Sequence, residues 1–392
     1  MGFVLVSMLS CTNDVLEMKQ TDEASRIYLS AGIGEVVSSR TPYYPTSENN
    51  TVLTVPTTEH PLNVSVWATT DKTGIYSNDG LNGSNGTVAI HTQAHFQSGT
   101  PQLLGAAIYP KAPEENADPD PVFFVGFHPQ STTQQPWSAT NENQSATFIF
   151  TGKEDVMFAP QISGVYETAF DNSPQFRFYH LLTWLRIEMV ADKDENDILK
   201  KEAIAEAWGK IKSLTISSRK QVTVNSLGKT YTNADDMKKN IVDNLTFGGT
   251  ESAMNFYHTG TDISFPKDTE GYPIPSALTE VAYVMCAPVE GEYQHTVDGV
   301  DVKKPEYTLH LQTEKRELDI PIDLKIAADD VVDSYFTGST RGHQFKILLN
   351  FKMGNVISVS AEISLGANAD WYTHGTGTGD IKEEDITNTG TE

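Results

Sequence analysis

The sequence predicts a mainly β protein, built from two tandem β-sandwich domains with one or two short helices in the second domain. Apolar and polar residues alternate with a period of two in many short segments, and clusters of Gly, Pro, Asn and Asp separate these segments. The chain has 392 residues, which is long enough for two domains, each with its own core. We place the break near residues 170–174, where Asp-Asn-Ser-Pro interrupts the alternation, and so expect domains at residues 27–172 and 173–374.

The first expected strand opens the first domain and carries one apolar face. Its apolar side chains occupy every second position and therefore share that face; they are Ile27, Leu29, Ala31 and Ile33. Burial of each large side chain is worth roughly 1.5–3 kcal/mol. Loss of this strand would leave an open sheet edge that favours a substitute strand.

The rest of the first domain shows further strands separated by turn-rich spacers. Strands are expected at residues 62–68, 103–109, 122–127 and 147–150. Residues 78–86 are rich in Asn and Gly, and residues 110–121 are rich in Pro and acids, so we expect both spacers to be loops. An open barrel would give a similar pattern of strands and turns.

The second domain combines strands with the helical stretches. Residues 198–211 have apolar side chains at helical spacing after an acidic start that suits the helix dipole, and a shorter helix is expected at residues 235–244. The unbroken apolar run at residues 281–287 contains Cys286 and is typical of a central strand with an inert core thiol.

The last strands of the second domain include an edge strand and a hairpin. Residues 318–326 alternate between apolar and polar, but Pro321 donates no ladder hydrogen bond, so this strand is expected at a sheet edge. Residues 345–351 and 357–363 alternate on either side of a short turn and predict a β-hairpin.

Charge and motif content exclude several kinds of function. The net charge of −24 argues against a nucleic-acid partner, because proteins bind phosphates with Lys and Arg. The sequence contains no nucleophile-elbow serine motif, no P-loop and no zinc-protease motif. We therefore expect no enzyme activity, no catalytic residues and no cofactor.

A few side chains are of the types that bind metal ions or stack on sugars. His91 and His95 share a strand face but have no third ligand nearby in sequence, and the acidic run at residues 192–197 lacks the glycine and the last carboxylate of a calcium loop. No metal site is expected. Trp137 lies in a polar segment and is expected to be exposed, unlike the other tryptophans.

The two ends of the chain lack the alternating pattern of the strands. Mostly apolar residues and Ser10 precede Cys11, which polar and acidic sequence follows, so we expect residues 1–11 to be a bacterial lipoprotein signal with lipid on Cys11. Residues 12–26 would form a linker. The alternative is an incidental cysteine in an unprocessed N-terminus. Residues 375–392 lack alternating apolar residues and predict a flexible tail that would make a poor donor strand.

Several short motifs occur in an order that is typical of one family. After the cysteine and the first strand come Ser-Ser-Arg-Thr, Phe-His-Pro, Asp-Val-Met-Phe-Ala, Phe-Arg-Phe-Tyr-His-Leu-Leu and Gly-His-Gln-Phe, at residues 38–41, 127–129, 155–159, 176–182 and 342–345. In this order they resemble the fimbrillins, the type V pilins of gut and oral anaerobic bacteria, over about residues 11–371. His180, which lies in the fourth motif, is expected to be a structural residue that satisfies a core hydrogen bond.

The resemblance implies two transthyretin-like β-sandwiches in a surface lipoprotein of the outer membrane, acting as a fimbrial structural, tip or accessory subunit and adhesin. Such proteins assemble by strand exchange: an arginine-specific protease removes the first strand, and a strand of a neighbouring subunit takes its place. Arg40 lies after the first strand, and Thr41, unlike a proline, leaves the bond between them cleavable. The alternative is that Arg40 is an ordinary loop arginine. The implied partners are other fimbrial subunits, the protease, the outer membrane through the lipid, and a host or bacterial surface ligand.

Two other classes of protein compete with a fimbrial subunit. A surface glycan-binding lipoprotein would show an exposed row of aromatic side chains on one sheet face. An enzyme would need a cleft with converging carboxylates or histidines. The tail favours a tip or accessory subunit over a repeating stalk subunit, and the sequence leaves the stalk, tip and anchor roles open.

Overall fold

A computed structural model of the chain describes residues 26–33, 62–73, 76, 91–96, 102–109, 120–134, 136–140, 144–165, 174–191, 197–229, 244–259, 261, 263–267, 269–291, 306–323, 325–328, 331–335, 338–352 and 357–363. Several sequence predictions lie outside these residues: the leader with Cys11, the linker up to residue 25, Arg40, Thr41, all but the last residue of the second helix, and the tail. None of the helices in the described ranges is long and apolar enough to cross a membrane.

The structure is mainly β, as predicted. Its described residues contain one α-helix, α2 (Asp197–Trp208), which matches the helix expected at residues 198–211. The strands of the described ranges form six sheets, and two of these sheets have only two strands each. These small sheets pair β17 (Glu290–Gly291) with β22 (Gly338–Ser339) and β20 (Lys325–Ala328) with β21 (Val331–Tyr335).

The largest sheet has seven strands and contains the first strand of the chain. In spatial order it runs β3 (His91–Phe96), β2 (Leu62–Thr69), β5 (Val122–His128), β8 (Met157–Gly164), β9 (Gln175–His180), β1 (Arg26–Ile33) and β4 (Gln102–Ile108). Its end strands, β3 and β4, contact each other, so the sheet curves round on itself. The strands predicted for the start of the chain are all present in this sheet or in β7.

Three further sheets have four or five strands each. A five-stranded sheet runs β15 (Tyr257–His258), β16 (Thr279–Cys286), β10 (Thr183–Ala191), β23 (Gln344–Phe351) and β24 (Ile357–Ile363). A four-stranded sheet runs β14 (Ser252–Asn255), β11 (Ile211–Ser218), β18 (Glu306–Thr313) and β19 (Glu317–Asp323). Another runs β13 (Leu245–Gly248), β12 (Gln221–Val224), β7 (Ser145–Ile149) and β6 (Ser138–Thr140).

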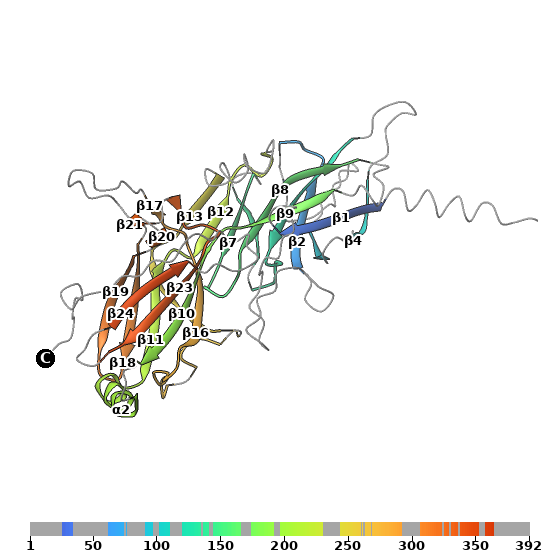
Figure 1. The fold of residues 1–392 in the computed structure, drawn as a ribbon. Helices are drawn as coiled ribbons and strands as arrows, with labels where there is room; N and C mark the ends of the chain where they lie inside the picture. Colours follow the sequence, from blue (N-terminus) through green and yellow to red (C-terminus); the bar gives the residue numbers. More distant parts are fainter. Residues whose placement is uncertain are drawn as a thin grey trace, which may run out of the picture.

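Figure 1 shows an elongated molecule with these sheets distributed along its length. The seven-stranded sheet lies at one end, the β10 and β11 sheets with α2 lie at the other, and β7, β12 and β13 lie between them. Helix α2 ends against β23, where the Trp208 indole N–H donates to the carbonyl of Lys352 at 3.1 Å and its ring meets Phe351 edge-on.

Three predictions about single strands in the second half are confirmed. Strands β23 and β24 pair antiparallel as the expected hairpin. Residues 281–287 are buried, and β16 lies between β15 and β10 as an interior strand. Strand β19, which contains Pro321, lies at the end of its sheet.

The expected domain break at residues 172 and 173 is crossed by strand pairing. Strand β9 follows the break in sequence but belongs to the seven-stranded sheet, and β12 pairs with β7 from before the break. An Asp-Asn-Ser-Pro segment is polar whether it joins two strands of one sheet or two domains, so the sequence pattern cannot distinguish the two.

Among the residues that the structure describes, the buried apolar side chains form two clusters. The first core lies in the seven-stranded sheet and contains residues of β1, β2, β5, β8 and β9. The larger core extends from Trp67 on β2 to Ile357 on β24 and includes side chains of all the larger sheets. The two ends of the molecule therefore share apolar packing through the middle.

Candidate functional site

The inner face of β1 is the first candidate site, because the sequence predicts that this strand is exchanged. Ile27, Leu29 and Ala31 are at most 1% exposed and belong to the first core. They alternate along the strand as predicted. Of the fourth residue, Ile33, the structure describes the backbone, which pairs with Phe178 of β9.

The two halves of β1 pair with two different neighbouring strands. Residues 26–29 pair antiparallel with β4, and residues 30–33 pair parallel with β9. The Ser30 backbone N–H also donates to the carbonyl of Pro174 at 3.0 Å, just before β9 begins. Strand β1 therefore lies inside the sheet, and we call the space that it fills between β4 and β9 the β1 slot.

The side of the β1 slot formed by β9 is tightly packed. Phe176 and Phe178 are both fully buried, with ring centroids 5.7 Å apart. Phe178 lies so close to Gly126 of β5 that a Cβ added to the glycine would lie 2.7 Å from the ring. The β9 side of the β1 slot is therefore closely packed against β5.

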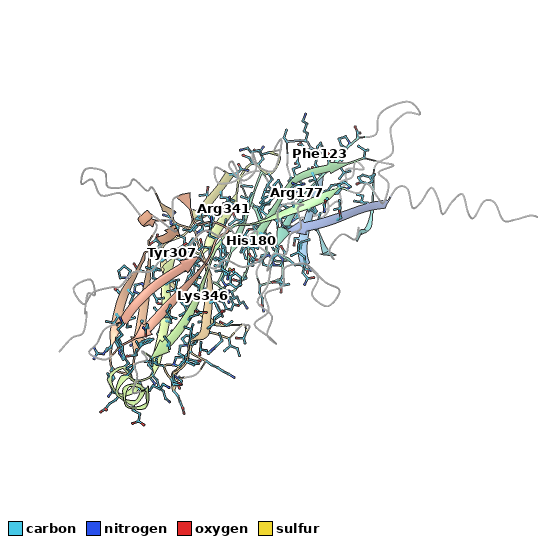
Figure 2. All side chains as sticks on the ribbon, in the orientation of Figure 1. Phe123, Arg177, His180, Tyr307, Arg341 and Lys346 are labelled. Atoms are coloured by element: carbon cyan, nitrogen blue, oxygen red, sulfur yellow. The ribbon has the colours of Figure 1, made fainter. Side chains whose placement is uncertain are left out.

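Strand β9 continues directly into a buried polar joint between the two ends of the molecule. His180, its last residue, lies 2.8 Å from the carboxylate of Asp155, and these side chains are 3% and 1% exposed. Arg341, also buried, donates to the carbonyl of His180 at 3.3 Å. Figure 2 shows His180 and Arg341 near the middle of the molecule. The prediction that His180 satisfies a core hydrogen bond is confirmed.

Backbone hydrogen bonds fix the same joint. Leu181 donates to Val156, Gly342 donates to Leu182, and Trp184 donates to His343, all at 2.8–3.0 Å. Gly342 has a φ of 68°, a left-handed conformation that glycine adopts without strain. Sequence reasoning missed Arg341, although the Thr-Arg-Gly-His turn before the last hairpin was the available signal.

A second buried network lies beside the joint. The Tyr307 hydroxyl is 2.8 Å from the Thr340 hydroxyl and donates to the carbonyl of Ala287, and Thr183 donates to the carbonyl of Thr340 at 2.9 Å. Burial raises the pKa of the Cys286 thiol to about 12, so it remains protonated and unreactive at neutral pH. This agrees with the inert core thiol expected from the sequence.

One group of side chains has the hydrogen-bond order of an acyl-transfer triad. Ser217 Oγ lies 3.0 Å from His310 Nε2, and His310 Nδ1 lies 2.5 Å from Asp319 Oδ1, across β11, β18 and β19. The His310 and Asp319 side chains are 36% and 46% exposed. Oxyanion stabilisation depends on a water-excluded site, so this exposed sheet face favours a cross-strand contact over catalysis.

Of the candidate metal ligands, the structure describes the backbone of His91 and His95. His91 pairs with Trp67 and His95 with Asn63 along β3, and the acidic residues at 192–196 lie outside the described residues. The part of the chain that the structure describes contains no group of three His, Cys, Asp or Glu residues that could hold a metal ion.

The expectation that Trp137 is exposed is wrong. Its side chain is 1% exposed, packs against Phe127 and Phe148, and donates its indole N–H to the carbonyl of Pro129 at 3.1 Å. The polar neighbours in sequence therefore surround a buried ring. Among the described residues, the exposed large hydrophobic side chains are all aliphatic: Ile149, Val165, Ile263 and Leu278.

Comparison with known proteins yields likenesses to solved structures. No protein-family model matches the chain, and no curated protein matches it. A candidate cell adhesion protein from Bacteroides ovatus is 13% identical, with 86% of this chain and 95% of that chain covered and a TM-score of 0.42. Candidate polysaccharide-binding proteins from Bacteroides thetaiotaomicron are 9% identical, with 92% of this chain and 99% of that chain covered and a TM-score of 0.40. The fimbrial anchor protein Mfa2 from Porphyromonas gingivalis is 10% identical, with 90% of this chain and 99% of that chain covered and a TM-score of 0.31.

The solved structures that this chain resembles thus include cell adhesion and fimbrial proteins, the kind of protein that the sequence motifs resemble.

Proposed function

We propose that this protein is a fimbrial subunit, either structural or at the tip or an accessory position, and an adhesin. Its two ends would be transthyretin-like β-sandwiches, and it would reach the outer membrane as a lipoprotein anchored through Cys11. Cleavage between Arg40 and Thr41 by an arginine-specific protease would sever β1 from the rest of the chain, and a strand of another fimbrial subunit would then displace it from the β1 slot.

One observation supports this proposal above all: β1 is a short strand at the start of the described chain, and its apolar face lies in the first core. Ile27, Leu29 and Ala31 contact that core from a strand that only backbone ladders and side-chain packing hold between β4 and β9. Loss of the strand would leave two unpaired sheet edges and an apolar gap, which a substitute strand would fill.

The energetics favour exchange over spontaneous loss. Two large buried side chains, Ile27 and Leu29, contribute roughly 1.5–3 kcal/mol each, or roughly 3–6 kcal/mol together. The hydrogen bonds to β4 and β9 add to this value. A cut after Arg40 would therefore leave β1 seated until a competing strand arrives.

The test is limited digestion of the full chain with an arginine-specific protease, for wild type and the Arg40→Ala variant. Mass spectrometry identifies the cut, and sedimentation identifies the assembly state. We expect wild type to be cut after Arg40 and to lose β1 once a competing donor strand is present, and we expect Arg40→Ala to stay monomeric with β1 in place. Equal loss of the first strand from both proteins, or an uncut Arg40 in wild type, would overturn activation at this residue.

A further inference from the structure

Arg177 is a cation on β9 next to a position of β1 that has no side chain. The parallel register pairs Arg177 with Gly32, and residues that pair across a sheet project to the same face. Phe176 and Phe178, on either side of Arg177, are fully buried, so Arg177 projects to the opposite, outer face of the sheet, where it is half-buried. Figure 2 shows Arg177 on β9, the strand beside β1.

No described residue pairs with Arg177 by an ion pair or a side-chain hydrogen bond. Cations on the other sheets do have such partners: Arg186 pairs with Glu280, Lys212 with Glu314, and Lys346 with Glu188. Arg177 is half-buried, has no carboxylate partner among the described residues and lies beside a strand position without a side chain. An incoming strand can therefore gain a contact here that β1 cannot make.

The half of β1 that faces β9 is also the half with small residues. Ser30, Ala31 and Gly32 pair with residues 175–177, and a glycine inside a strand weakens it because it has no side chain to pack. At Gly32, strand β1 therefore offers no side chain that could contact Arg177 of β9.

We propose that the strand that replaces β1 is a segment of another subunit with a carboxylate in register with Gly32, set against Arg177. Its inner face would carry apolar residues in register with Ile27, Leu29 and Ala31, and its outer face would carry Asp or Glu at that one position. This inference rests on the proposed strand exchange and names the chemistry of the donor strand. The ion pair makes the donor a better occupant of the β1 slot than the strand that it displaces.

The first experiment places the acidic residue in β1 itself. Four full-chain variants are compared: Gly32→Glu and Gly32→Gln, each with Arg177 retained and with Arg177→Gln. The Glu and Gln side chains are nearly the same size, so the pair isolates the charge, and hydrogen exchange of residues 26–33 in the uncut protein reports how firmly β1 is held.

With Arg177 retained, Gly32→Glu should slow exchange of β1 about 2- to 5-fold relative to Gly32→Gln, as expected for a partly exposed cross-strand ion pair. The difference should shrink at high salt and vanish in the Arg177→Gln background. Equal exchange of the two Gly32 variants, or a difference that persists without Arg177, would overturn the inference.

The second experiment tests the donor in trans and separates this inference from strand exchange as such. Synthetic peptides of residues 26–36, with either Glu or Gln in place of Gly32, compete for the full chain cut after Arg40. Faster displacement by the Glu peptide supports the inference. Equal displacement by both peptides overturns the inference about Arg177 but leaves strand exchange standing. If neither peptide displaces β1, the result counts against strand exchange, and the first experiment decides the role of Arg177.

Discussion

Replacement of Leu29 with alanine should loosen β1 more than it loosens the rest of the molecule. Leu29 is fully buried and lies where the pairing of β1 passes from β4 to β9. A buried Leu→Ala substitution costs roughly 2–5 kcal/mol, because apolar contacts are lost and a cavity remains. At about 1.4 kcal/mol per tenfold change, the lower end of this range raises the local opening of β1 about 30-fold.

Hydrogen exchange of the uncut chain measures this opening without any proteolysis. Two further leucines are matched controls: Leu349 on β23 is equally buried but belongs to the larger core, and Leu278 is 56% exposed. Leu349→Ala should raise exchange in β23 and leave β1 nearly unchanged, and Leu278→Ala should change neither.

The reasoning requires that β1 open as a unit separate from the larger core. If Leu29→Ala left the exchange of β1 at the wild-type rate, the buried side chain would not be holding the strand. If Leu349→Ala raised the exchange of β1 as much as Leu29→Ala does, the molecule would open as one unit, and a strand that leaves by itself would be refuted.

Three further predictions concern packing, pH and reactivity. Gly126→Ala should lower stability by roughly 1–3 kcal/mol in thermal unfolding, because its Cβ would lie 2.7 Å from the Phe178 ring, whereas Gly248→Ala, with only ordinary contacts, should change it little. Burial lowers the pKa of His128 below its usual value of 6.5, so the folded state binds that proton more weakly than the unfolded chain does. Stability should therefore fall as the pH drops below about 6.5, and less steeply in His128→Gln; equal slopes would contradict this. A fluorophosphonate probe should not label Ser217, and stoichiometric labelling detected by mass spectrometry would mean that the exposed triad is reactive.

The strands that the sequence predicts well are those whose pattern is local. The hairpin of β23 and β24 follows from alternation around a short turn, and the edge position of β19 follows from the missing N–H of Pro321. The buried face of β1 could likewise be predicted, because Ile27, Leu29 and Ala31 recur at the period of a strand.

Pairings between distant segments could not be predicted, because periodicity shows which face is buried and not which strand lies alongside. The parallel pairing of β1 with β9 and the crossing of the expected domain break by β7 and β12 are of this kind. His180 and Asp155 were both recognised as motif residues, yet their contact spans 25 residues of sequence and appears only in the fold. The exposure of Trp137 was mispredicted for the same reason, since its hydrogen bond to Pro129 and its aromatic neighbours depend on tertiary structure.

The parallel register of β1 and β9 has a mechanical consequence. Two parallel strands pulled from opposite ends of their ladder load its hydrogen bonds together, in shear, rather than one after another. Strand β9 passes without interruption through His180 into the joint held by Asp155 and Arg341, and from there into β10. If a donor strand is seated in the β1 slot as proposed, tension on it would pass through this joint to the other end of the subunit.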